Sequence, residues 1–560
     1  MNPFTVRSLA GVACCASIAL MLSACSQPGD SDAQTATTTE PPWISDLGNG
    51  EYKNPVLYAD YSDPDVIRVD DTYYMTSSSF NSAPGLPLLT SKDMINWELV
   101  GHAVQNQVPD EVFSVPQHGN GIWAPCLRYH DGKFWIFWGD PDFGIYQVHA
   151  EDFEGPWSEP HRVVAGEGLI DPTPLWDDDG KAYLLHAWAK SRSGINNILT
   201  LRRMKPDASG LVDDGKLGEG TTVVDGHQLE GYRTLEGPKF SKRDGEYYIF
   251  APAGGVEPGW QSVFRAEQIG GPYEDRIVLA QGDTEVNGPH QGSWVQTPEG
   301  EDWFFHFQSK GTYGRIVHLQ PMEWQDGWPV MGQNQTPEGV GEPVARHRKP
   351  VTGFPVKVPA TTDEFESETL GHQWQWNANW QREWYSLSER PGHLRLHAYQ
   401  HDSTTGEDNL WLNPALVMQK VPAPEFTVTT RLDINTERDG DRAGLVMFGE
   451  DYAWIGLEQQ GDQHQLVQKT CTDARAGCDE QTLGQVAYPE GEPVYLRLHF
   501  HTDQTVDFEY SPDGQNYETL GERFATRRGR WVGGKIGLFS EGSDEAYLDA
   551  DYFRVTPPVE

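Results

Sequence analysis

Short apolar runs separated by turn residues fill the chain from about residue 49 to residue 345, and helical spacing is scarce there. One pattern occurs five times: a polar turn, often Asp-Gly, followed by an apolar or aromatic run. Such a turn between strand-like segments is typical of a β-hairpin. The five copies begin at Asp70, Asp131, Asp179, Asp244 and Gly300.

The five copies recur at intervals of roughly 50 to 65 residues. Repeats of about this period, built from short strands, predict a β-propeller with one blade per repeat. A generic β-sandwich, in which hairpins also recur, is the alternative, and the number of copies favours five blades. The strands that follow the turns are anchored on Tyr73, Phe134, Ala182, Tyr247 and Trp303.

The last third of the chain alternates between apolar and polar residues, as in FTVTTRLDI from Phe426 and VYLRLHF from Val494. A period of two without helical spacing predicts an antiparallel sandwich. We therefore expect a propeller over residues 49–345, a linker over 346–362 and a sandwich over 363–560. Three tryptophans of the last segment are interpreted as core residues in preference to a ligand-binding face: Trp374, Trp376 and Trp380.

The first residues have the features of a targeting signal. Arg7 precedes an apolar run from Leu9 to Leu22, which is too short to span a bilayer comfortably. The sequence then reads Leu-Ser-Ala-Cys, which resembles a bacterial lipobox, and Ser26 resembles an outer-membrane sorting signal. We expect a signal peptide over 1–24, a lipid anchor at Cys25 in the outer membrane or periplasm, and a tether over 25–48. An ordinary signal peptide with a chance cysteine is the alternative.

The composition narrows the classes of partner. Asp and Glu number 83 against 42 Lys and Arg, for a net charge of -41, so binding to nucleic acid or to an anionic lipid surface is disfavoured. A neutral ligand such as a sugar suits this charge, although solubility alone explains it equally well. Cys471 and Cys478 bracket a short loop and predict a disulfide in an oxidising compartment.

Five chemistry-bearing residues precede the hairpin turns at similar offsets, roughly 10 to 13 residues before each anchor. Because the innermost strand of a blade comes first, we expect them to meet at one mouth of the channel. A single acid beside Pro or Gly is usually a turn residue, but three acids at matching offsets indicate a site. The five are Asp63, Trp123, Asp171, Glu236 and His290.

The segments around these residues resemble glycoside hydrolase family 43. The matching strings are YSDPDVIRVDD, GIWAPCLRYHDG, LIDPTPLWDDDG, TLEGPKFSKRDG and YGRIVHLQPMEW. The string SSSFNSAPGLPLLTSKDMINW is similar to the β-xylosidase and α-L-arabinofuranosidase branch, and within it to subfamily 12. The resemblance implies an all-β chain: a five-bladed β-propeller followed by a concanavalin-like jelly roll.

The resemblance also implies roles for the three carboxyl groups. Asp63 is expected to be the general base, Glu236 the general acid, and Asp171 the residue that orients Glu236 and raises its pKa. Cleavage through an oxocarbenium-like transition state requires one protonated and one ionised carboxyl, and a third negative charge disfavours ionisation of the acid. Asp65 is a second acid near the base, but its offset of two residues prevents it from replacing Asp63 without a shift of register.

Further residues are expected to contact the ligand. By resemblance, Arg315 binds the sugar in the deepest subsite and Trp123 stacks on it, while the segment from Phe80 to Pro87 narrows the mouth. His290 is expected to hold a structural calcium or another cation on the channel axis. Because calcium prefers several oxygen ligands, water must supply most of its shell.

The implied function is exo-acting, inverting hydrolysis that removes terminal α-L-arabinofuranosyl or β-D-xylosyl units from plant polysaccharide. The sequence does not decide between the two sugars, although we lean towards the arabinofuranosidase; a strict β-xylosidase is one alternative. A non-catalytic glycan-binding lipoprotein is another, and the intact trio of acids disfavours it. A retaining fructosidase is discounted because its NDPNG, RDP and EC motifs are absent. Contact with a membrane is expected through the N-terminal lipid alone.

Overall fold

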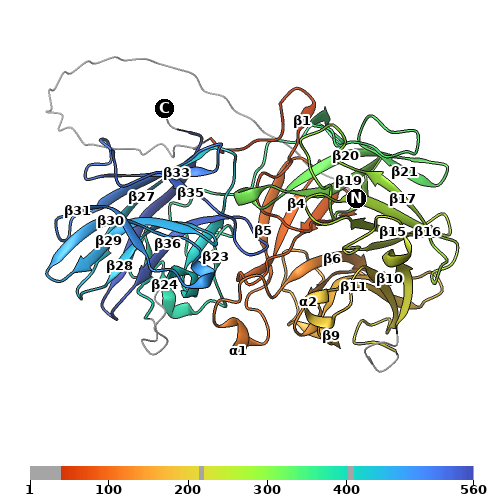
Figure 1. The fold of residues 1–560 in the computed structure, drawn as a ribbon, viewed down its shortest axis with the longest axis horizontal. Coiled ribbons are helices and arrows are strands. Elements are labelled where there is room, and N and C mark those ends of the chain that lie inside the picture. The colour runs from red at the N-terminus through yellow and green to blue at the C-terminus, as the bar shows by residue number, and fades with distance from the viewer. Residues whose placement is uncertain (1–39, 213–219, 401–408, 559–560) are drawn as a thin grey trace, which may run out of the picture. The chain divides into compact units, whose positions relative to one another are not determined.

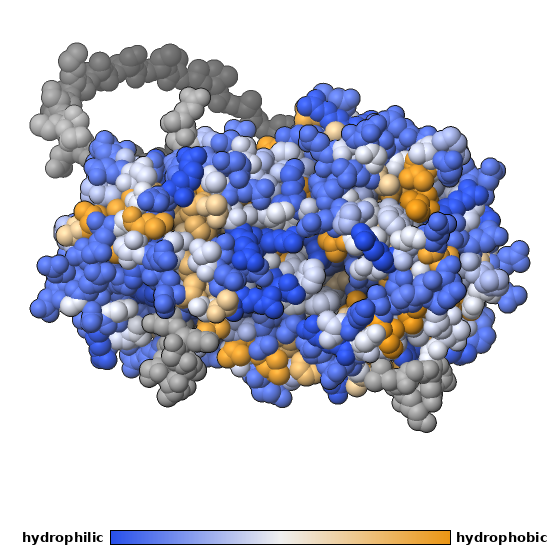
Figure 2. Space-filling view, viewed as in Figure 1, coloured by the Kyte–Doolittle hydropathy of each residue, from blue (hydrophilic) through white to orange (hydrophobic). Residues whose placement is uncertain are grey.

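The computed structural model describes residues 40–212, 220–400 and 409–558 (Figure 1). The expected signal peptide and the lipid-bearing Cys25 lie outside these residues. Within the described ranges, no helix has the length and apolar character needed to cross a bilayer. Hydrophilic residues cover most of the face shown in Figure 2, and hydrophobic residues lie there in small separate patches.

Five sheets of four antiparallel strands form the first part of the chain, and each sheet keeps its strands in sequence order. The first two sheets comprise β2 (Asp65–Val69), β3 (Thr72–Thr76), β4 (Gly85–Ser91) and β5 (Trp97–Val104), then β6 (Trp123–His130), β7 (Lys133–Asp140), β8 (Gly144–Ala150) and β9 (His161–Ala165). The third and fourth comprise β10 (Leu169–Trp176), β11 (Ala182–Trp188), β12 (Ile198–Met204) and β13 (Thr221–Asp225), then β14 (Lys239–Arg243), β15 (Glu246–Ala253), β16 (Trp260–Ala266) and β17 (Glu274–Leu279). The fifth comprises β18 (Trp294–Gln296), β19 (Asp302–Ser309), β20 (Arg315–Gln325) and β21 (Trp328–Met331).

These sheets are the five predicted blades. The second strand of every blade carries one of the five anchor residues, as expected for a hairpin turn between the first and second strands. The first strands contact one another in turn: β2 contacts β6 and β18, and β10 contacts β6 and β14. A propeller with its innermost strand first in each blade is therefore confirmed.

A short two-stranded sheet lies outside the blades. Strand β1 (Glu51–Lys53) pairs antiparallel with β22 (Arg346–Arg348), and Tyr52 lies opposite His347. The hydroxyl of the fully buried Tyr52 donates to the carbonyl of Leu319 in blade five at 2.8 Å. The two ends of the propeller segment are thus joined by backbone pairing, and β22 falls within the segment expected to be a linker.

The second part of the chain consists of two antiparallel sheets, of seven and eight strands. The first contains β23 (Gln375–Trp376), β26 (Val417–Lys420), β28 (Arg442–Phe448), β29 (Tyr452–Gln460), β30 (Gln463–Cys471), β31 (Gln481–Ala487) and β36 (Lys535–Glu541). The second contains β24 (Tyr385–Ser386), β25 (Leu394–His397), β27 (Phe426–Asn435), β32 (Val494–Phe500), β33 (Thr505–Ser511), β34 (Glu518–Thr519), β35 (Phe524–Ala525) and β37 (Tyr547–Thr556). Trp374 and Trp376 are 1% and 2% exposed in the core of this sandwich, and Trp380 packs against it.

The helices that the structure describes are single turns. They are α1 (Asp110–Phe113), α2 (Lys190–Ser193) and the 3-10 turns η1 (Gly226–Gln228), η2 (Gly311–Tyr313), η3 (Arg382–Trp384), η4 (Leu410–Leu412) and η5 (Ala474–Ala476). The all-β class expected from the sequence is therefore confirmed.

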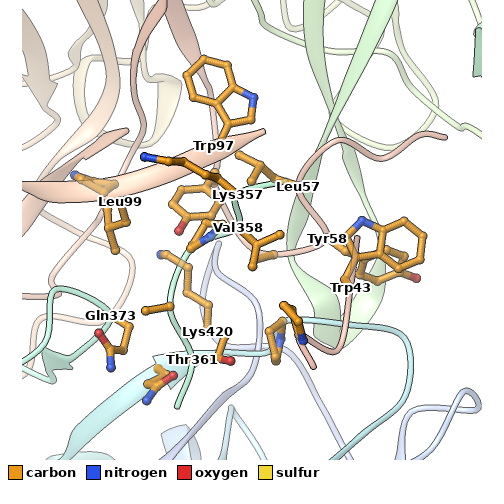
Figure 3. A pocket seen from close by; sticks show the side chains of 18 of the residues that line it. Trp43, Leu57, Tyr58, Trp97, Leu99, Lys357, Val358, Thr361, Gln373 and Lys420 are labelled. Carbon is orange, nitrogen blue, oxygen red and sulfur yellow. The ribbon is translucent and has the colours of Figure 1, made fainter. Parts of the chain in front are cut away.

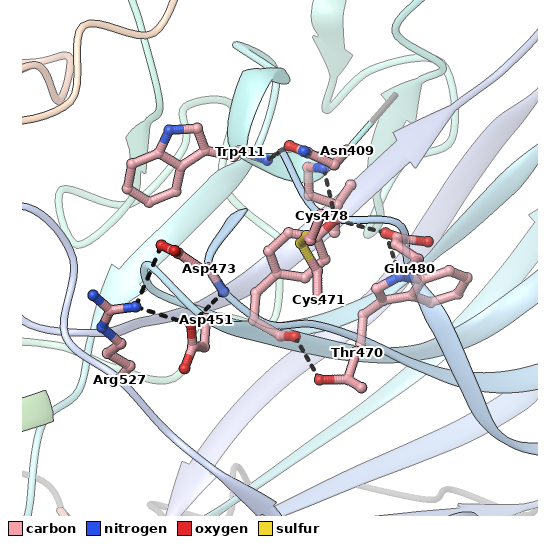
Figure 4. Close-up of a disulfide and its surroundings, with 12 residues drawn as sticks. Asn409, Trp411, Asp451, Thr470, Cys471, Asp473, Cys478, Glu480 and Arg527 are labelled. Carbon is pink, nitrogen blue, oxygen red and sulfur yellow. Dashed lines mark hydrogen bonds and ion pairs between the residues drawn. A yellow bond between two sulfur atoms is a disulfide. The ribbon is translucent and has the colours of Figure 1, made fainter. Parts of the chain in front are cut away.

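A disulfide joins Cys471 and Cys478, as the sequence predicts (Figure 4). The loop that it closes contains η5 and carries Asp473, whose carboxylate lies 3.6 Å from the guanidinium of Arg527. Arg527 also contacts Asp451 at 3.2 Å. The disulfide loop therefore helps to hold the start of the segment that joins β35 to β36.

Buried polar contacts join the propeller to the sandwich. The backbones of Ala83 and Trp376 exchange two hydrogen bonds, at 2.6 and 3.2 Å. One oxygen of the buried Asp60 accepts from the backbone N–H of Arg315 at 2.8 Å, and its other oxygen accepts from that of Gly533 at 2.9 Å. One carboxylate thus links the start of β20 to the segment before β36.

Candidate active site

The three predicted carboxyl groups line a single cavity. Asp63 precedes the inner strand of blade one, Asp171 lies within that of blade three, and Glu236 precedes that of blade four. The cavity has a volume of about 370 Å³. The cavity is also lined by Phe80, Trp123 and Arg315, so the residues expected to bind the sugar lie beside the acids.

Asp63 is held from two sides. A terminal nitrogen of the Arg315 guanidinium lies 3.0 Å from each of its carboxylate oxygens. The hydroxyl of Ser78 donates to the same carboxylate at 2.5 Å and accepts from the backbone N–H of Ala124 at 2.7 Å. With only 4% of Asp63 exposed, this side chain is fixed in position and reaches solvent only through the cavity.

The backbone is strained at three residues of the site. Asp63, Phe80 and Asp171 have φ angles of 53°, 50° and 53°, in the left-handed region that residues other than glycine rarely adopt. In β10 the pairing register shifts between Ile170 and Thr173, so Asp171 sits in a bulge. A bulge redirects a side chain and often occurs beside an active site, where such strain also gathers.

Glu236 and Asp171 both have raised pKa values. Burial, followed by the charge of Asp63, raises the pKa of Glu236 to about 7, although Arg315 opposes this shift. Burial and the charges of Glu236 and Asp63 raise the pKa of Asp171 well above its ordinary value. One oxygen of Asp171 accepts the backbone N–H of Gly237 at 2.8 Å. The pair therefore retains a proton at a pH where an exposed carboxyl group has lost it.

His290 lies next to Glu236. Its Nε2 is 3.4 Å from the carboxylate of Glu236, while its buried Nδ1 has no hydrogen-bond partner among the described residues. Burial, together with the charge of Arg315, lowers the pKa of His290 to about 3, so the ring is neutral.

The surroundings of His290 do not form a calcium site by themselves. Within the described part of the chain, no group of three or more His, Cys, Asp or Glu residues has the spacing of a metal site. Calcium requires six to eight oxygen ligands, and the free Nδ1 is a single nitrogen donor. The expected cation thus stays a prediction.

Asp65 belongs to a separate ion cluster. It is 1% exposed and contacts Arg128 at 3.1 Å, Lys239 at 3.5 Å and the Ser293 hydroxyl at 2.6 Å. Burial alone would raise the pKa of Asp65, but Lys239 and Arg128 hold it below its ordinary value. Asp65 therefore stays charged in a structural cluster, in agreement with the register argument from the sequence.

The sandwich also contributes to the cavity. Trp531, between β35 and β36, lines it, is 42% exposed and has a φ of 64°. A side chain added at Gly119, in the loop before β6, would collide with Arg530 and Trp531. Arg528 forms an ion pair with Glu257 of the propeller at 2.8 Å. These contacts hold the Trp531 loop, residues 526–534, beside the cavity.

Two residues of the site, Ser78 and Trp531, were not expected from the sequence. Ser78 is one serine in a run of three, and Trp531 lies far from the acids in the sequence. Trp531 stands among arginines and glycines and outside any alternating strand, which indicates an exposed aromatic residue. This pattern does not indicate which cavity the residue lines.

Comparisons with known proteins agree with this geometry. The model of glycosyl hydrolases family 43 matches residues 52–329, and that of the beta xylosidase C-terminal concanavalin A-like domain matches residues 362–556. A putative beta-xylosidase of Xylanibacter ruminicola is 37% identical over 88% of this chain and 87% of its own length. A non-reducing end alpha-L-arabinofuranosidase of Bacteroides ovatus is 28% identical over 91% and 96%.

A solved structure shows the same architecture over nearly the whole length. The xylan beta-1,4-xylosidase of Bacillus halodurans superposes with a TM-score of 0.78 at 26% identity, covering 90% of this chain and 99% of that protein.

Proposed function

The chain belongs to glycosyl hydrolase family 43. We propose that it removes single β-D-xylosyl or α-L-arabinofuranosyl units from the ends of hemicellulose chains, with inversion of the anomeric centre. The observation that carries this proposal is the grouping of Asp63, Asp171 and Glu236 in one cavity that Trp531 also lines. A non-catalytic binding protein has no need for three acids gathered in one cavity, two of them with raised pKa values.

The proposed reaction divides the proton transfers between two residues. Protonated Glu236 donates its proton to the glycosidic oxygen as the bond to the anomeric carbon breaks. Ionised Asp63 removes a proton from the water that attacks that carbon from the opposite face. Both groups then exchange protons with solvent. Ser78 and Arg315 hold Asp63 in place, so they act as positioning residues in this step, and Arg315 also faces the sugar.

Proton NMR of the first-formed sugar tests this proposal. Hydrolysis of an aryl β-D-xyloside is expected to release α-D-xylose before mutarotation, since a water between base and sugar attacks from the face opposite the leaving group. Release of β-D-xylose would mean that a carboxylate attacks the sugar directly, and the role of Asp63 as a base would be lost.

The choice of sugar rests on the relatives. Those at 37% and 32% identity are named as beta-xylosidases, and the one named as an arabinofuranosidase is 28% identical. We therefore propose that xylosides are the better substrates, in contrast to the preference drawn from the sequence. Comparing kcat/KM for 4-nitrophenyl β-D-xyloside and α-L-arabinofuranoside measures this; a higher value for the arabinofuranoside would restore the earlier preference.

The rate should fall as the pH rises through about 7. Because Glu236 must be protonated and its pKa is raised to about 7, activity is present below that pH and is lost above it. Asp171 and Glu236 retain a proton between them, and in Asp171→Asn the remaining carboxyl ionises beside a neutral amide, so the alkaline limb of kcat/KM should move to lower pH. A lower rate with an unmoved limb would show that Asp171 only positions Glu236.

Trp531→Ala should weaken binding of the sugar that follows the terminal, cleaved unit. Stacking on an aromatic ring is worth about 0.5–1.5 kcal/mol, so KM for xylotriose should rise about twofold to tenfold. Xylosyl fluoride has no second sugar and should change less than about twofold. Phe354→Ala, which removes another exposed aromatic side chain outside the cavity, is the matched control. Equal changes on both substrates would contradict this role.

We further propose that the protein is attached to a bacterial membrane through a lipid on Cys25. The support is the lipobox-like sequence that precedes this cysteine. Labelling cells with a palmitate analogue should mark the native protein and leave Cys25→Ser unlabelled. Equal labelling of the two proteins would exclude this anchor.

A further inference from the structure

Two further cavities lie where the propeller meets the sandwich. The first, lined by Trp43, Leu57 and Val358 (Figure 3), has a volume of about 60 Å³ and shares no lining residue with the active-site cavity. That volume holds roughly four to six water molecules, which is too little for a sugar. The second, which we call the outer cavity, has a volume of about 430 Å³, within the range of about 300–1,000 Å³ that is typical of small-molecule sites.

The outer cavity adjoins the active-site cavity. Four residues line both of them: Thr234, Val256, Arg315 and Trp531. The propeller forms one side of the outer cavity, and residues 528–532 of the sandwich form much of the other. A substrate larger than one sugar can therefore extend from the acids past Trp531 into this second space.

Opposite charges already neutralise four of the five charged side chains that line the outer cavity. The pairs are Arg315 with Asp63 at 3.0 Å, Arg528 with Glu257 at 2.8 Å, and Glu450 with Arg527 at 2.7 Å. Arg530 is the fifth, and its guanidinium forms no ion pair with any carboxylate that the structure describes. One positive charge without a counter-charge therefore lines a cavity beside the three acids.

Two contacts hold the side chain of Arg530. Its guanidinium carbon lies 4.7 Å from the ring centre of Trp531, within the distance of about 6 Å that is typical of a cation–π contact. Its stem lies against Gly119 in the loop before β6, where a methyl group would approach Cγ of Arg530 to 2.5 Å. The guanidinium is thus held beside the aromatic ring that we expect to contact the sugar following the cleaved unit.

We propose that the outer cavity binds a uronate branch on the sugar that follows the cleaved unit, with the branch carboxylate on the guanidinium of Arg530. This inference rests on the proposed function, because it names a preferred substrate of the same site. A planar guanidinium donates two parallel hydrogen bonds to a carboxylate, whereas neutral hydroxyls would leave its charge uncompensated. The net charge of -41 does not prevent binding, since salt screens charges more than about 8–10 Å away.

The probe is xylotriose whose middle unit carries a glucuronate branch. Its carboxyl-reduced form, in which the branch is glucose, is the neutral counterpart of nearly the same shape. Release of xylose from the non-reducing end should have a kcat/KM at least fivefold higher for the acid. The difference should lie mainly in KM, because the branch is bound equally before and during bond cleavage. It should decrease in about 1 M salt.

Substitutions at Arg530 test which group binds the carboxylate. Arg530→Met retains an apolar stem against Gly119 and should bring the ratio of the two kcat/KM values to within about twofold of one. Arg530→Lys keeps the charge and should retain a ratio of at least about threefold. Lys190→Met is the matched control, since Lys190 lines the active-site cavity and forms no ion pair with the described carboxylates; its ratio should stay at least fivefold. A ratio of two substrates cancels any general effect of a substitution on folding or catalysis.

Binding to Glu236→Gln provides a measurement that does not need hydrolysis. Calorimetry should detect at least fivefold tighter binding of the acid than of its reduced form, and adding Arg530→Met should abolish that difference. Equal kcat/KM values for the two branched substrates, release of xylose from neither of them, or a preference that persists in Arg530→Met would overturn the inference. A preference lost in Lys190→Met alone would place the carboxylate on Lys190 instead. Failure to hydrolyse unbranched xylotriose would contradict the proposed function, and the binding measurement would still test Arg530.

Discussion

Asp63→Asn is expected to lower kcat/KM by about 100-fold or more on every substrate, whatever its leaving group. The amide has nearly the same shape and still accepts the hydrogen bond from Ser78, but it cannot take a proton from the attacking water. The loss should therefore appear equally on xylobiose and on activated aryl xylosides. Steady-state kinetics on both substrates, with the melting temperature as a check of folding, measure this result.

Asp65→Asn is the matched control for that change. This carboxylate lies two residues further along the chain and balances Arg128 and Lys239. Removing one partner of a buried ion cluster costs about 3–5 kcal/mol of stability, so the melting temperature should fall while the folded fraction keeps its kcat. If Asp65→Asn abolished catalysis in folded protein while Asp63→Asn did not, the two roles would have to be exchanged.

Glu236→Gln is expected to show a loss that depends on the leaving group. Xylobiose needs a proton on its departing oxygen, so kcat/KM should fall by about 100-fold or more. A dinitrophenolate leaves without that proton, so 2,4-dinitrophenyl β-D-xyloside should lose less than about tenfold. A plot of rate against leaving-group pKa should therefore be much steeper for the variant than for the native enzyme.

Glu257→Gln provides the comparison for that variant. Glu257 stands at the rim and pairs with Arg528 at 2.8 Å, and both of these side chains are about half exposed. Its amide should change the rate by less than about threefold on either substrate. Equal losses of Glu236→Gln on good and poor leaving groups would remove Glu236 from the role of general acid.

The architecture could be predicted from the sequence because each blade contains the same kind of turn, followed by an apolar strand. Asp131 and Asp244 begin Asp-Gly turns, and the next strand follows each turn directly. A few neighbouring residues are therefore enough to predict these hairpins. The three acids could also be recognised, since each precedes its hairpin by a similar number of residues. Their meeting in one cavity confirms that positions along equivalent strands become neighbours in a closed propeller.

What the sequence could not provide depends on long-range geometry. The positive φ angles of Asp63 and Asp171 exist because the surrounding blades hold them, and no local pattern marks them. Trp531 reaches the cavity from the other domain, and β22 forms only because β1 lies beside it. The pairing of these segments is decided by packing between distant parts of the chain.

The carboxylate of Asp60 has a consequence for how such proteins can evolve. Its two oxygens accept from the backbone N–H groups of Arg315, which lines the active-site cavity, and of Gly533, which precedes the last sandwich strands. A gene that lost or exchanged its second half would leave that buried charge half-satisfied beside Arg315. Exchanging one half alone is therefore expected to destabilise the other, even when each half retains its own core.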